Sequence, residues 1–115
     1  ARAVRWDART SGSWAAELEG ADVLINLCGR SVNCRYEAAN RREILESRLA
    51  PTRALGEAVF RCRRPPAVWL NAASATIYRH AEDRPMTEDG GEIGDGFSVS
   101  VCQQWETAFF GALTP

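Results

Sequence analysis

Two short apolar runs, each ending in small residues, restrict the folds that this chain can adopt. Residues 21–29 read A-D-V-L-I-N-L-C-G, and residues 67–78 read A-V-W-L-N-A-A-S-A-T-I-Y. Runs that are apolar on both faces are typical of parallel strands covered by helices. Because little bulk follows Asn71, a ligand can approach the backbone at the carboxyl end of the second run. The sequence therefore predicts interior strands of a parallel sheet, with a cleft at that end.

Segments with helical spacing separate and follow these runs. Apolar residues recur at intervals of three and four over residues 36–64 and again over residues 97–112. Pro51 lies inside the first segment, so we expect a kink or two helices, the second starting at Pro51. Residues 1–7 read as a further short strand, and residues 79–95 as a long loop rich in Gly, Pro and acidic residues. This alternation predicts a single α/β domain over residues 1–115.

Composition argues against several kinds of function. All 14 basic residues are arginine, so chemistry that needs a lysine is excluded. A net charge of -1 argues against nucleic-acid binding. The four cysteines form no C-x-x-C pair and His80 is the single histidine, so no metal site is expected. Since the sequence shows no apolar run of about 18 residues and no signal segment, we expect a cytoplasmic protein outside the membrane.

Five blocks of sequence carry a resemblance to a known family when they are taken in order. They read D-V-L-I-N-L-C-G at 22–29, R-R-E-I-L-E-S-R at 41–48 followed by T-R-A-L at 52–55, N-A-A-S-A-T-I-Y at 71–78, M-T-E-D at 86–89 and V-C-Q-Q-W-E at 101–106. Their order and spacing are similar to those of the NAD(P)-dependent nucleotide-sugar epimerase/dehydratase-like family. That family is an atypical group of the extended short-chain dehydrogenase/reductases, and the resemblance covers nearly the whole chain.

The resemblance implies a cofactor site for NAD(P). The family's strand-end turn, which passes near the nicotinamide ribose, matches Asn26, Leu27, Cys28 and Gly29, with cysteine where alanine is usual. Asp7 falls where an acidic residue near the adenine ring is often found. The resemblance also implies a nucleotide sugar as a possible ligand.

Catalytic residues follow from the same resemblance. Ser74 matches the serine that hydrogen-bonds the reacting substrate oxygen, and Tyr78 matches an aromatic position typical of the group. In the superfamily, a lysine four residues after a tyrosine lowers the tyrosine pKa for proton transfer. If Glu106 is aligned with the glutamate that follows this pair, Ser98 and Cys102 occupy the two positions. Neither side chain can replace the pair, so we expect ordinary catalysis to be lost.

A glycine-rich phosphate-binding turn is also absent from the sequence, together with the strand before it. The chain begins at what corresponds to the third strand of the family's fold. We therefore expect a partial Rossmann-like parallel sheet flanked by helices and truncated at its N-terminal side. Without its usual neighbour, the strand over residues 22–28 has an exposed hydrophobic edge. We expect that edge to pair with a second copy of the chain, giving a homodimer.

Two hypotheses about function stay open. The first is an epimerase or reductase domain that uses NAD(P) and is without activity as an isolated chain. The second is a non-catalytic oligomeric remnant or binding module that retains a cleft near Ser74. An α/β interaction module unrelated to this family is a third reading, since fold does not fix function.

Overall fold

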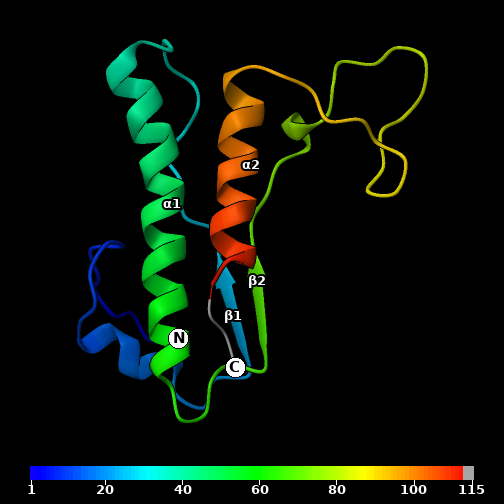
Figure 1. Ribbon diagram of the computed structural model, residues 1–115. Coiled ribbons are helices and arrows are strands. Elements are labelled where there is room, and N and C mark those ends of the chain that lie inside the picture. The colour runs from blue at the N-terminus through cyan, green and yellow to red at the C-terminus, as the bar shows by residue number, and fades with distance from the viewer. Residues whose placement is uncertain (113–115) are drawn as a thin grey trace.

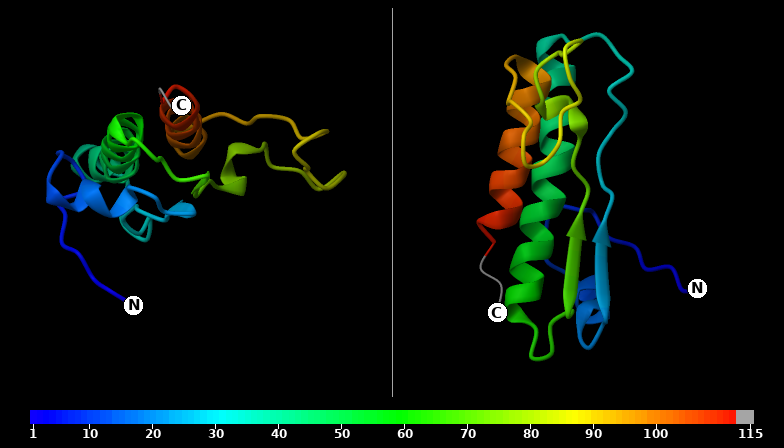
Figure 2. Two further views of the ribbon diagram at one scale, coloured as in Figure 1. Left: turned by 90° about the horizontal axis from the view of Figure 1, so that it is seen from below. Right: turned by 90° about the vertical axis from the view of Figure 1, so that its right-hand side faces the viewer.

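Both helices of the protein lie on one face of a small parallel sheet in the computed structural model, which describes residues 1–112 (Figures 1 and 2). The elements are the 3-10 helix η1 (Ser13–Leu18), β1 (Val23–Asn26), α1 (Ala38–Arg61), β2 (Val68–Asn71), the 3-10 helix η2 (Ala75–Ile77) and α2 (Phe97–Phe110). The α/β class and the predicted parallel strands are thus confirmed. The loop after η2 is also confirmed over its described length, apart from an isolated bridge between Tyr78 and Ile93.

The sheet presents its two faces differently because side chains alternate along each strand. β1 and β2 pair in register, with Leu24 opposite Trp69. These two side chains face the helices, where they pack against a core formed by α1 and η1. Trp69 also meets Phe109 of α2 edge to face, with ring centroids 4.8 Å apart. The inner face of the sheet is therefore covered by both helices.

The outer sheet face, formed by Val23, Ile25, Val68 and Leu70, is bare. Val23 pairs with Val68 and Ile25 pairs with Leu70, so the four aliphatic side chains form one patch. Their exposed fractions run from 46% for Val68 to 58% for Ile25. Parallel sheets are usually covered on both faces. Within residues 1–112, this outer face is left half-exposed.

Helix α1 continues through Pro51, so the predicted alternative of two helices is wrong (Figure 1). A proline removes one backbone donor from a helix and crowds the preceding turn. Here Pro51 is buried, and the helix packs against α2 and, through residues 54–59, against the inner face of the sheet. Packing on two sides offsets the local cost, which sequence spacing does not reveal.

The predicted strand over residues 1–7 is also wrong. These residues form no strand in the described chain, and the first five of them are exposed. A strand needs a hydrogen-bonded neighbour, and the sheet consists of β1 and β2 alone over residues 1–112. The segment ends in a turn at Ala8, whose φ of 59° is uncommon outside glycine.

One buried hydroxyl, that of Thr52, connects both helices and both strands. It donates to the carbonyl of Arg48 at 2.8 Å and accepts from the indole Nε1 of Trp105 at 3.2 Å. It also accepts from Nδ2 of Asn26 at 3.3 Å, and the same amide nitrogen donates to Oδ1 of Asn71 at 2.6 Å. Thr52 is 0% exposed and Asn26 is 2% exposed. This Thr52 network therefore fixes α1, α2, β1 and β2 relative to one another.

Replacing Thr52 by valine keeps the side-chain shape and removes the shared hydroxyl. The substitution leaves the Trp105 indole and one proton of the Asn26 amide buried without an acceptor, so we expect a loss of roughly 2 to 4 kcal/mol in the free energy of unfolding. Denaturant unfolding followed by circular dichroism measures it. The matched control is Thr107→Val, which removes an exposed hydroxyl that donates to the carbonyl of Gln103 at 2.8 Å. The control should change stability by less than about 0.5 kcal/mol; equal effects of the two variants would contradict the role of Thr52.

Candidate functional site

The turn that follows β1 is shaped by one side chain from the strand and one from α1. Oδ1 of Asn26 accepts from the backbone N–H of Cys28 at 3.1 Å, which bends the chain directly after the strand. The Arg48 side chain then crosses Gly29, where an added Cβ would lie 3.0 Å from Cζ of Arg48. Gly29 is thus required for close approach. Leu27, between them, is 76% exposed.

A cleft of about 320 Å³ brings three of the predicted cofactor residues together. Asp7, Cys28 and Gly29 line it, together with Glu46, Ser47, Ala50 and Pro51 of α1. Asn26 is turned inward to the Thr52 network, and Leu27 does not line the cleft. The cofactor roles of all five residues stay predictions. The structure assigns Asn26 a positioning role, because it sets the course of the turn.

The Asp7 carboxylate is committed to its own turn. Oδ1 accepts from the backbone N–H groups of Arg9 and Thr10 at 2.9 Å, and Oδ2 accepts from the Thr10 hydroxyl at 2.6 Å. These hydrogen bonds, led by that of the hydroxyl, lower the pKa of Asp7 to about 2. The group is therefore charged at neutral pH, and a ligand would meet an acceptor that is already fixed in direction.

A second cavity, of about 290 Å³, lies between α1, α2 and the end of β2, and we call it the Ser74 cavity. The side chains on its wall that carry polar groups are Tyr36, Arg48, Ser74, Thr76, Ser98 and Cys102. Ser98 and Cys102, which stand at the tyrosine and lysine positions if Glu106 is aligned with the family's glutamate, thus line the same cavity as Ser74. Helix α2 begins at this cavity, with no side-chain cap and no acidic residue in its first turn.

Ser74 belongs to a chain of neutral hydrogen-bonding groups. Its Oγ accepts from the backbone N–H of Thr76 at 3.2 Å, which caps η2, and lies 2.9 Å from the Thr76 hydroxyl. That hydroxyl lies 3.4 Å from Sγ of Cys102. No histidine or carboxylate lines the Ser74 cavity in the described chain. Ser74 can orient a substrate oxygen by a hydrogen bond, but no base is placed to activate it as a nucleophile.

Tyr78 lies on a different cavity from Ser74. It lines a space with His80 and Ile93, and its ring covers Gly91, where an added Cβ would lie 2.5 Å from Cε1 of the tyrosine. The η2 turn separates the two predicted catalytic residues. Their catalytic roles stay predictions, but the geometry does not bring the two side chains to one reacting centre.

The loop beside Tyr78 is held by ion pairs around Arg79. Its guanidinium contacts Asp83 at 3.2 Å and Glu92 at 3.1 Å, and Arg84 contacts the same glutamate at 2.6 Å. Hydrogen bonds from Arg79 lower the pKa of both Asp83 and Glu92. These carboxylates are therefore occupied in shaping the loop, and the described residues contain no group of three or more potential metal ligands.

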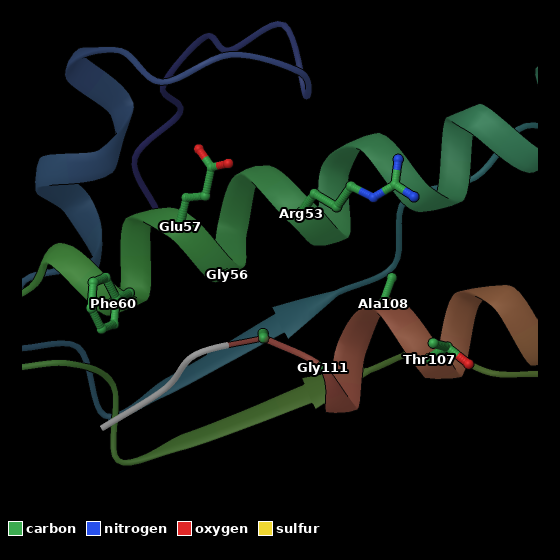
Figure 3. Close-up of a pocket in the computed structure, with 8 residues that line it drawn as sticks. Arg53, Gly56, Glu57, Phe60, Thr107, Ala108 and Gly111 are labelled. Carbon is green, nitrogen blue, oxygen red and sulfur yellow. The ribbon is translucent and has the colours of Figure 1, made fainter.

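Three further features of the described residues are the Cys28 thiol, a groove between the two helices, and the length and polarity of the helices. Burial raises the pKa of the Cys28 thiol, so this side chain stands in the cleft at the end of β1 in its protonated, neutral form. A groove of about 370 Å³ runs between α1 and α2 near the C-terminal ends of both helices, with Arg53, Glu57 and Phe60 on one side and Thr107 on the other (Figure 3). This groove contains none of the predicted site residues. Within residues 1–112, no helix is long and apolar enough to cross a bilayer.

Sequence reasoning missed the roles of Arg48 and Thr52. Both stand in blocks that carried the family resemblance, but there they appeared only as polar positions of an amphipathic helix. No pattern in one sequence marks a threonine as a shared acceptor or an arginine as the wall of a cavity. Those roles depend on which residues of distant segments lie beside Arg48 and Thr52 in the folded chain.

Comparisons with known proteins agree on one group. An epimerase family protein of Staphylococcus saprophyticus is 32% identical over 103 residues, which cover 90% of this chain and 34% of that protein. The epimerase family protein SDR39U1 of Bos taurus is 30% identical over 110 residues, covering 91% of this chain and 35% of the relative. The chain spans about a third of the length of these curated relatives. No protein-family model matches the sequence.

Two solved structures share the fold. The crystal structure of human epimerase family protein SDR39U1 (isoform 2) with NADPH superposes with a TM-score of 0.73 at 29% identity, covering 88% of this chain and 35% of that one. The nucleoside-diphosphate sugar epimerase from Corynebacterium glutamicum gives a TM-score of 0.71 at 30% identity, covering 94% and 22%.

Proposed function

Because the chain belongs to the epimerase family, we propose that it supplies part of a site for hydride transfer between NADP(H) and a small substrate. In this proposal the turn after β1 lies against the cofactor and Ser74 binds the reacting oxygen of the substrate. The matched relatives are about three times as long as this chain. The proposed activity is therefore that of a protein of their length.

The observation that carries the proposal is the cofactor cleft at the end of β1. Asp7 reaches Cys28 and Gly29 there from a separate segment of the chain. The cleft opens beside the carboxyl end of a parallel strand, which is where ligands bind in open α/β sheets. Further support comes from the related human protein, whose crystal structure was determined with NADPH.

The cleft, of about 320 Å³, is large enough for one part of a dinucleotide but not for the whole cofactor. The neutral Cys28 thiol and the bare backbone of Gly29 leave room for a flat ring or a ribose. When bound, NADP(H) would donate or accept a hydride. The protein's part is to hold the cofactor with this turn and to orient the substrate oxygen by the Ser74 hydroxyl.

Proton transfer is the step for which the described residues offer no tyrosine–lysine pair beside Ser74. Ser98 and Cys102 stand where a tyrosine and a lysine would act, and the Ser74–Thr76–Cys102 contacts join neutral groups. We therefore expect the isolated chain to be inactive. This absence of a base favours the second candidate function, a binding module that keeps the cleft without turnover.

A measurement of NADPH binding distinguishes the two candidate functions, which both keep the cleft, from an unrelated interaction module. We expect NADPH to change the tryptophan fluorescence, and Gly29→Val to weaken its binding at least tenfold, because the new side chain would displace Arg48 and fill the cleft. Gly90→Val is the matched control, since a Cβ there would be 3.5 Å from its nearest neighbour in a loop distant in sequence from the cleft. Equal binding by the two variants, or no binding by the native chain, would refute the cofactor site.

We further propose that a second copy of the chain covers the outer sheet face. Val23, Ile25, Val68 and Leu70 form an apolar patch without a charged side chain, and such a patch can meet itself across a two-fold axis. The free edge of β1 adjoins it, but pairing of edges alone would extend the sheet and leave this face exposed, so the proposed contact is face to face. This homodimer would remove the exposed apolar surface that a bare parallel sheet leaves.

Light scattering after gel filtration tests the homodimer. We expect a dimer at micromolar concentration, and a monomer for the double variant Ile25→Lys, Leu70→Glu, whose opposite charges can pair across the strands. Phe60→Lys is the control, since Phe60 is as exposed as Ile25, at 58%, but lies on α1. A monomeric native chain, or dissociation caused by the control alone, would overturn this interface.

A further inference from the structure

Arg48 extends from α1 between the turn after β1 and the Ser74 cavity. Nη1 donates to the carbonyl of Ile44 at 2.9 Å, and Nη2 donates to the carbonyl of Arg30 at 3.2 Å. Cζ lies 5.4 Å from the ring centroid of Trp105, over the face of the indole. The side chain is half-buried and is held in one orientation by two elements and an aromatic ring.

The charge of Arg48 has no counter-ion among residues 1–112. Its hydrogen bonds go to neutral acceptors, the two carbonyls and, at 3.5 Å, the hydroxyl of Ser47. Other half-buried arginines are paired: Arg30 contacts Glu43 at 2.5 Å, and Arg79 contacts two carboxylates. Removing a charge from water without a partner is costly. An anion bound beside Arg48 would supply the missing partner.

The walls of the Ser74 cavity indicate what else such a ligand should carry. Arg48 is its only charged wall residue in the described chain, so no carboxylate would repel an anion. The apolar walls include Ile44, Phe97 and Trp105, and hydroxyl groups come from Tyr36, Ser74, Thr76 and Ser98. A volume of about 290 Å³ suits a small molecule and is too little for a dinucleotide.

We propose that the Ser74 cavity binds a small organic acid, with its carboxylate on Arg48, its apolar body against Phe97 and Trp105, and an oxygen near Ser74. The planar guanidinium suits a carboxylate, and its stacking on Trp105 preserves that geometry. The substrate class for hydride transfer would then be an oxo acid or hydroxy acid. Only this assignment as substrate rests on the proposed function; the binding preference of the cavity does not.

Paired ligands test the proposal on the native chain without cofactor. Benzoate and benzamide have the same size and ring but differ in charge. Isothermal titration should show benzoate binding at least tenfold more tightly than benzamide and than inorganic phosphate, which lacks the apolar body. If benzamide bound as tightly as benzoate, the charge would play no part in binding. If phosphate bound as tightly as benzoate, the apolar walls would play no part. Because NADPH is not in the experiment, its failure to bind would leave this result unchanged.

Variants of two arginines on α1 locate the site. Arg48→Gln should weaken benzoate binding at least tenfold and bring it to the level of benzamide, whereas Arg48→Lys, which keeps the charge, should retain part of the preference. Arg53→Gln is the matched control, because Arg53 lines the groove between α1 and α2 instead (Figure 3). Circular dichroism checks the fold of each variant. If Arg48→Gln is unfolded, the proposal is still tested by comparing benzoate with benzamide on the native chain and on Arg48→Lys. Undiminished benzoate binding by folded Arg48→Gln would overturn the proposal.

Discussion

The hydroxyl of Thr52 is the interaction on which the arrangement of this small domain depends. It serves α1, α2 and β1 at once, and through the Asn26 amide it reaches Asn71 on β2. A two-stranded sheet buries little surface, so polar contacts that specify how helices meet strands carry unusual weight here. Apolar packing supplies most of the stabilisation, but the Thr52 network selects which of the possible packings forms.

Both candidate sites are built outward from this network. Asn26, held by Thr52, directs the turn that leads to Gly29, while Trp105, held by the same hydroxyl, lies under the guanidinium of Arg48. Arg48 in turn braces the turn through the carbonyl of Arg30. The cofactor cleft and the Ser74 cavity therefore share one support. A change in the Thr52 network should therefore alter both sites. In the proposed function, such a shared support would hold a cofactor and a substrate in fixed relation.

The sequence predicted the elements that depend on a local residue pattern. It missed the features that depend on contacts with distant segments of the chain. The apolar runs gave both strands, and periodic spacing gave α1 and α2. Pro51 did not break its helix because packing on two sides compensates, and residues 1–7 form no strand because no partner strand lies beside them. Ser74 was correctly expected at a cleft. Its separation from Tyr78 by the η2 turn could not be foreseen, since four residues of sequence do not fix the direction of a side chain.

Hydrogen exchange at the Cys28 amide tests whether Thr52 positions the site, because this N–H is held by the Asn26 side chain rather than by the sheet ladder. In Thr52→Val, under conditions where the chain stays folded, we expect faster exchange at Cys28. The amide of Gly111, which donates to the carbonyl of Thr107 outside the network, should keep its native rate. Unchanged exchange at Cys28, or equal acceleration at both amides, would contradict the claim that Thr52 positions the site.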